Sequence, residues 1–130
     1  MDVILDTSGL LALSGMVDKS LNPECLNTIK EAGNVYVSAA SLFEIGLKFK
    51  RGKLNLGKYE SSHKYWEDCI HSYDLQDLVV DSRCFANAVL LPDIHLDPFD
   101  RIIISEAIRL NVAIVTFDKI FDEYGVQTMS

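Results

Sequence analysis

The chain has 130 residues, of which 48% are hydrophobic, with 19 acidic against 12 basic residues and a net charge of −7. This length and apolar content predict one domain over residues 1–130, able to bury roughly two-thirds of its unfolded surface. The excess of acidic residues argues against a protein that coats nucleic acid over its whole surface. No apolar run reaches the ~20 residues of a membrane span. The first residues lack the basic region of a signal peptide, so we expect a cytoplasmic protein.

Strands and helices alternate along the chain. In the first half, apolar patterns and turn residues predict a strand over 2–5, helices over 7–14 and 20–32, a strand over 35–37, and a helix that opens at 38–41 and ends at 51–53. In the second half they predict a helix over 58–73, a strand over 75–80, helices over 81–90 and 98–110, a strand over 112–115, a helical turn over 118–123 and a last strand near 125–128. This alternation predicts an α/β fold in which helices cover both faces of a parallel sheet.

Four acids lie where predicted strands lead into helices: Asp6, Glu44, Asp100 and Asp118. Side chains that follow parallel strands meet at the carboxyl edge of the sheet, where ligands bind in open α/β folds. Carboxylates held that close raise one another's pKa unless a cation lies between them. Oxygen ligands of this kind suit Mg²⁺ or Mn²⁺, so the pattern predicts a metal-dependent nuclease.

Each acid also has a structural explanation as a helix cap. Asp6, Asp97 and Asp118 precede predicted helices, and Glu44 follows Ser41 at the spacing of a capping box. Negative charge at helix starts is stabilising whether or not a metal binds. The hypothesis of a shared site therefore depends on several acids lying at one edge of one sheet.

A basic stretch interrupts the acidic background. Residues 48–64 contain six basic side chains and one acid, a local charge of +5, which leaves −12 for the rest of the chain. Four of the basic residues are candidates for holding the backbone of a nucleic acid: Lys48, Lys50, Arg51 and Lys53. Such a strip beside an acidic pocket would steer a polyanion to the site, although a solvated helix end explains the same charges. The acidic remainder suits a basic protein partner.

The cysteines and histidines show no metal-binding pattern. The three cysteines are odd in number, widely spaced and without a CxxC pair, which indicates reduced, partly buried thiols: Cys25, Cys69 and Cys84. The three histidines lack metal-ligand spacing, and we expect them to be at the surface or hydrogen-bonded: His63, His71 and His95.

Four blocks of the sequence resemble the PIN-domain ribonucleases, and among them the VapC toxins of toxin–antitoxin pairs. They are Val3–Ser8, Glu44–Leu54, Asp97–Arg101 and Val115–Asp118, in the family's order and over nearly the whole chain. The resemblance implies a three-layer α/β/α sandwich with a central, mainly parallel sheet of four to five strands. It also implies hydrolysis of RNA phosphodiester bonds, a small VapB-like antitoxin as partner, and a homodimer.

The resemblance assigns roles residue by residue. Asp6, Glu44, Asp100 and Asp118 take the metal-site roles, with Asp97 as an alternative third ligand or an assisting residue. Thr116 matches a hydroxyl that orients a carboxylate or a water. Glu44 or Asp118 is the candidate for accepting a proton from water.

Two other classes of protein compete with this interpretation. An aspartate-based phosphotransfer domain also begins with a strand and an acid, but Ser8 stands where a phosphatase needs a second acid. A receiver domain expects adjacent acids after the first strand, and Asp6-Thr7 does not fit. The other class is a catalytically silent module that binds RNA or protein and uses the acids only as caps.

Overall fold

The computed structural model describes residues 1–130. In chain order its elements are β1 (Val3–Leu5), α1 (Thr7–Leu13), α2 (Pro23–Glu31), β2 (Val35–Ser38), α3 (Ala39–Lys50), α4 (Ser62–Ser72), β3 (Leu75–Leu78), α5 (Ser82–Leu90), α6 (Pro98–Leu110), β4 (Ala113–Val115), the 3₁₀ helix η1 (Lys119–Tyr124) and β5 (Thr128–Met129). None of the helices combines the length and apolar character needed to cross a lipid bilayer.

The five strands form one sheet in the order β3-β2-β1-β4-β5, and every neighbouring pair is parallel. The chain adds β2 and β3 on one side of β1 and then β4 and β5 on the other. The gap between the carboxyl ends of β1 and β4 is therefore a topological switch point, where open α/β sheets bind ligands.

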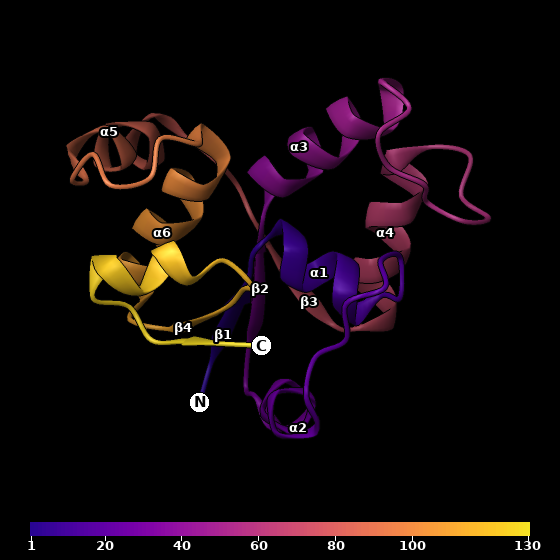
Figure 1. Cartoon of the computed structure of the whole chain (residues 1–130), viewed down its shortest axis with the longest axis horizontal. Coiled ribbons are helices and arrows are strands. Elements are labelled where there is room, and N and C mark those ends of the chain that lie inside the picture. The colour runs from indigo at the N-terminus through magenta and orange to yellow at the C-terminus, as the bar shows by residue number, and fades with distance from the viewer.

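Alternating residues of β1 serve two separate cores because successive strand side chains point to opposite faces. Val3 and Leu5 pack with α1, α2 and α4, whereas Ile4 packs with α6 and Phe121 of η1. A smaller apolar cluster joins α3, α5 and α6. Figure 1 shows α5 and α6 on one side of the sheet and α1, α2 and α4 on the other. The predicted three-layer α/β/α fold with a parallel sheet is confirmed.

Several predicted boundaries differ from the structure: the helix predicted over 20–32 is Pro23–Glu31, the strand predicted over 75–80 ends at Leu78, and the polar helix and the last strand both begin later than predicted. The polar helix predicted over 58–73 begins only at Ser62, because Gly57 has a positive φ of 61° and Ser61 caps the helix by accepting from the Lys64 N–H at 3.1 Å. The last strand is Thr128–Met129 rather than 125–128, because Gly125 ends η1 in the left-handed conformation. The three cysteines are free and buried, as predicted.

Candidate active site

Asp6 is buried at the carboxyl end of β1, with 3% of its surface exposed. Its Oδ1 accepts from the Gly9 N–H at 2.7 Å and from the Ser8 hydroxyl at 2.8 Å, and its Oδ2 accepts from the Thr116 hydroxyl at 2.5 Å. All three donors are uncharged. Burial raises the pKa of Asp6, although these hydrogen bonds act in the opposite direction.

The tight start of α1 depends on Gly9. A Cβ at this position would overlap the carbonyl oxygen of Val115 in β4. Glycine therefore lets α1 begin directly against the neighbouring strand, with the Gly9 N–H turned toward Asp6. The cap role predicted for Asp6 is confirmed, and it uses only one of the two carboxylate oxygens for the helix.

Thr116 links the first acid to Asp118. Its hydroxyl donates to Asp6 and also accepts from the Asp118 N–H at 3.0 Å. Asp118 caps η1 with Oδ1, which accepts from the Ile120 N–H at 3.0 Å. Its Oδ2 turns toward the imidazole of His95. The hydroxyl predicted near the site is thus in contact with two of the four predicted acids.

Glu44 enters the site from α3. Its Oε1 accepts from the buried Thr7 hydroxyl at 2.7 Å, and its Oε2 lies 2.9 Å from the Lys48 ammonium one turn further along α3. The capping box predicted between Ser41 and Glu44 is wrong. The helix begins earlier, and Ser38 caps it by accepting from the Ala40 N–H.

The two acids of the third block have different surroundings. Asp97 caps α6 through Oδ1, which accepts from the Asp100 N–H at 3.0 Å. Asp100 faces the site, with Oδ2 2.9 Å from Nε2 of His95. Its pKa is raised to about 8, first by burial and then by the charges of neighbouring acids, which are Asp97, Asp6, Glu44 and Asp118. Asp100 is therefore the acid that this block contributes to the cluster.

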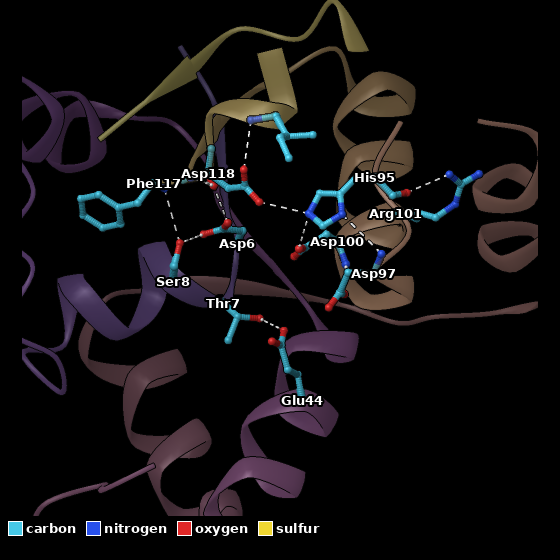
Figure 2. A network of polar contacts seen from close by, with 12 residues as sticks. Asp6, Thr7, Ser8, Glu44, His95, Asp97, Asp100, Arg101, Phe117 and Asp118 are labelled. Carbon is cyan, nitrogen blue, oxygen red and sulfur yellow. Dashed lines mark hydrogen bonds and ion pairs between the residues drawn. The ribbon is translucent and has the colours of Figure 1, made fainter. Parts of the chain in front are cut away.

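His95 is a member of the site that the sequence patterns do not predict. Its Nε2 lies 2.9 Å from Asp100 Oδ2 and 3.1 Å from Asp118 Oδ2, between the two carboxylates (Figure 2). The prediction of a hydrogen-bonded histidine is correct, but histidine spacing carries no sign of this position. The one signal in the sequence is that His95 lies five residues before Asp100, beside a block already assigned to the site. His63 and His71 are exposed.

The arrangement suits a hard divalent cation. Ligand atoms of His95, Asp100 and Asp118 lie within 4.8 Å of one another, and Asp6 and Glu44 are near enough to raise the pKa of Asp100. Lys48 is the one cationic side chain that contacts these acids, and it contacts only Glu44. Several carboxylate oxygens with unbalanced charge are the ligand set that Mg²⁺ and Mn²⁺ prefer.

A family model for the PIN domain matches residues 3–127. The chain belongs to the PIN domain family. The family expected from the four sequence blocks is confirmed, whereas the metal roles of the individual acids stay predictions. A comparison with the sequences of curated proteins finds no match.

Solved structures share the PIN fold over nearly the whole chain. VapBC2 from Rickettsia felis, bound to a DNA fragment from its promoter, has a TM-score of 0.70 at 18% identity and covers 98% of this chain and 97% of that one. VapBC-1 from nontypeable Haemophilus influenzae has a TM-score of 0.67 at 12% identity, covering 100% and 98%. FitAcB from Neisseria gonorrhoeae has a TM-score of 0.65 at 15% identity, covering 98% and 96%. At these identities the likeness establishes the fold.

The basic stretch of this PIN domain lies at the far end of the helix that carries Glu44. Lys50, Arg51 and Lys53 are exposed at the end of α3 and just beyond it. Lys48 differs from them because its ammonium is paired with Glu44. Three of the four predicted RNA-binding side chains are therefore free for a polyanion, and the fourth is already part of the acidic cluster.

Proposed function

We propose that this protein is a metal-dependent endoribonuclease and the toxin component of a VapBC-type toxin–antitoxin pair. PIN domains are generally nucleases. The observation that carries the proposal is the meeting of Asp6, Glu44, Asp100 and Asp118 at the switch point of the sheet. A domain that used acids only to cap helices would not need these four side chains to converge on one place.

Asp6, Glu44, Asp100 and Asp118 would hold the Mg²⁺ or Mn²⁺. When bound, such a cation supplies Lewis-acid chemistry that lowers the pKa of water and stabilises the charge of a phosphoryl transition state. The chain's other groups set the positions of these acids: Thr116 orients Asp6, and Thr7 orients Glu44.

Of the two candidates for accepting a proton from water, Asp118 is better placed. Its side chain is 38% exposed, whereas that of Glu44 is 11% exposed and is paired with the Lys48 ammonium. A general base must reach the water within hydrogen-bond distance. We therefore assign proton acceptance to Asp118 and a holding role to Glu44.

The RNA backbone would lie along the end of α3, on Lys50, Arg51 and Lys53. Contacts to phosphates position a nucleic acid without reading its sequence, so the choice of cleavage site depends on RNA shape. With cellular RNA as its substrate, the protein would act in the cytoplasm. Replacing Lys50 and Arg51 with alanine is expected to lower the magnitude of the salt slope of RNA binding by about 1–2.

Two protein partners belong to the proposal. A VapB-like antitoxin with a basic segment suits the charge of −12 outside residues 48–64, and the VapBC structures that share the fold support such a partner. A second copy of the chain suits the apolar groove between α3 and α5, where Phe43 and Phe85 are 63% and 54% exposed. Phe85→Glu is expected to convert a dimer to a monomer in light-scattering measurements.

The test of the function compares Asp6→Asn with Asp74→Asn. Asp74 is exposed, precedes β3 at the opposite end of the sheet and has a positive φ of 51°, which asparagine tolerates. We expect the wild type and Asp74→Asn to cleave RNA in Mg²⁺ or Mn²⁺ and to be toxic on expression, and EDTA to abolish cleavage. Asp6→Asn is expected to lose roughly three orders of magnitude in rate.

Sequencing the cleaved ends of cellular RNA after induction would identify the substrate, with Asp6→Asn as the background. Cleavage that continues in EDTA or in Asp6→Asn would contradict the metal mechanism. Binding of Mn²⁺ without cleavage of any RNA would favour the silent binding module instead.

A further inference from the structure

The backbone around His95, residues 91–97, is held in place by hydrogen bonds from Arg101 and Tyr124. The Arg101 guanidinium turns away from the acids and donates to four carbonyl oxygens at 2.7–3.0 Å, those of Ala88, Leu91, Pro92 and His95. The His95 N–H donates to the Tyr124 hydroxyl at 2.7 Å, and that hydroxyl donates to Pro92. These contacts tie the end of α5, the start of α6 and η1 together around one histidine.

The imidazole ring is also fixed in orientation. It packs edge-on against Phe121, with ring centroids 5.8 Å apart, and its side chain is 15% exposed. The Asp97 N–H points at Nδ1 from 3.3 Å. A backbone N–H can only donate, so Nδ1 must be the acceptor, and the proton of the neutral ring is then on Nε2.

Nε2 is the nitrogen that faces the acids. The Nε2–H donates to Asp118 Oδ2 at 3.1 Å, and Asp100 Oδ2 lies 2.9 Å from the same nitrogen (Figure 2). To bind a cation directly, Nε2 would have to lose its proton to Nδ1. A proton on Nδ1 would point at the hydrogen of the Asp97 N–H, and the two would repel each other. The geometry therefore opposes direct ligation of a metal by Nε2.

We propose that His95 is a positioning residue that donates through Nε2–H to Asp118, lies in contact with Asp100, and is not a ligand of the metal. The inference rests on the proposed function, because it concerns how these acids receive a cation. Nε2 lies against Asp100, from α6, and donates to Asp118, which follows β4, so His95 sets the spacing of these two acids before the cation arrives. The ligand set is then all oxygen, which favours Mg²⁺ and Mn²⁺ over Zn²⁺ or Ni²⁺.

The tautomer can be measured without any substitution. In protein labelled with ¹⁵N-histidine, long-range ¹H–¹⁵N spectra distinguish a protonated Nε2 from a protonated Nδ1. We expect the Nε2–H form both without metal and in saturating Mg²⁺. In the Mn²⁺ form, pulsed electron paramagnetic resonance is expected to show no directly coordinated ¹⁴N. An Nδ1–H tautomer in Mg²⁺, or a coordinated nitrogen in Mn²⁺, would overturn the proposal.

Two substitutions of His95 test whether its Nε2–H donor contributes to metal affinity. His95→Ala is expected to weaken Mn²⁺ binding by about 10–100-fold, measured by titration calorimetry. His95→Gln keeps an N–H donor near the position of Nε2, and we expect it to recover most of the affinity. His71→Gln, at an exposed histidine, is the control. Equal loss in the Ala and Gln variants, or no loss in either, would overturn the proposal.

The outcomes separate the two hypotheses. A wild type that binds no divalent ion contradicts the proposed function, and the hydrogen-bond assignment is then decided by the tautomer in the metal-free protein. A wild type that binds Mn²⁺ through the His95 nitrogen leaves the nuclease proposal intact and overturns only the positioning role of His95.

Discussion

Asp6 and Glu106 are equally buried, each with 3% of its surface exposed, yet their pKa values move in opposite directions. Glu106 in α6 lies 2.6 Å from the Arg109 guanidinium and accepts from the Cys84 thiol at 2.9 Å. Burial acts to raise the pKa of Glu106, but these two partners hold it below its ordinary value. Asp6 has only uncharged donors, and burial raises its pKa.

The difference separates a structural acid from a functional one. The fold pairs Glu106 with its own cation, the Arg109 guanidinium, and Glu106 in turn links α6 to Cys84 of α5. At the carboxyl end of the sheet, the fold gathers acids and supplies only Lys48 to one of them. Buried charge is tolerated when it is paired, so the unpaired cluster is where a cation from solution would have the largest effect.

The largest expected effect comes from removing the internal cation. Arg109→Met leaves Glu106 buried and unpaired, and we expect the free energy of unfolding to fall by about 3 kcal/mol, at the lower end of the effect for buried pairs because Arg109 is partly exposed. Urea denaturation at pH 7 measures this change. Lys30→Met, at an exposed position on α2, is the control. An equal loss in both variants would show that the pairing of Glu106 does not matter.

Supplying an external cation is the converse experiment. At a hundredfold excess over the dissociation constant, Mn²⁺ is expected to stabilise the wild type by about 2.7 kcal/mol. The gain is expected to be larger at pH 8 than at pH 6, because protons compete for acids whose pKa is raised. Thermal unfolding with and without EDTA measures it. The same stabilisation in Asp6→Asn would exclude the acid cluster as the binding site.

Most of the fold and three of the four acids could be predicted from the local sequence, because these three directly follow a strand or lie in the first turn of a helix. Glu44 lies inside α3, and its role was expected from the family resemblance. Asp6 and Asp118 follow short apolar strands, and Asp97-Pro98 marks a helix start. Local sequence therefore sets their place in the parallel sheet.

His95 could not be found in this way. It lies in an irregular segment whose path is set by Arg101 and Tyr124, which are 6 and 29 residues away in sequence. Spacing rules describe regular elements and give no position for such a residue. The late start of α4 has a similar cause, since the turn at Gly57 and the Ser61 cap decide it rather than the helical pattern of residues 58–61.

The third prediction concerns one acid of the cluster, Asp100, and the pH dependence of the free energy of unfolding. The pKa of Asp100 is about 8 in the fold and near 4 when unfolded. Between these values the folded chain binds the extra proton, so its stability falls as pH rises from about 4 to 8. In EDTA at pH 8.5, Asp100→Asn is expected to be more stable than the wild type by at least about 1.4 kcal/mol, one pKa unit.

Urea denaturation across this pH range measures the effect. The gain of Asp100→Asn is expected to shrink as pH falls toward 4, whereas Asp74→Asn is expected to follow the wild type throughout. Glu106 has the opposite sign: its pKa is lowered in the fold, so its contribution is present above its unfolded pKa and is lost as pH falls further. A wild type whose stability does not change between pH 5 and 8 would contradict the raised pKa of Asp100.

The smallest expected effect tests the hydroxyl that joins two acids. Thr116→Val keeps the shape of the buried side chain but removes the donor to Asp6 and the acceptor for the Asp118 N–H. We expect a loss of about 1 kcal/mol in unfolding free energy and up to about tenfold weaker Mn²⁺ binding. Thr116→Ser keeps the hydroxyl, and it is expected to retain the wild-type affinity for Mn²⁺. If the valine variant binds Mn²⁺ as tightly as the serine variant, Thr116 only fills space, and the order of the acids must come from the sheet and from His95.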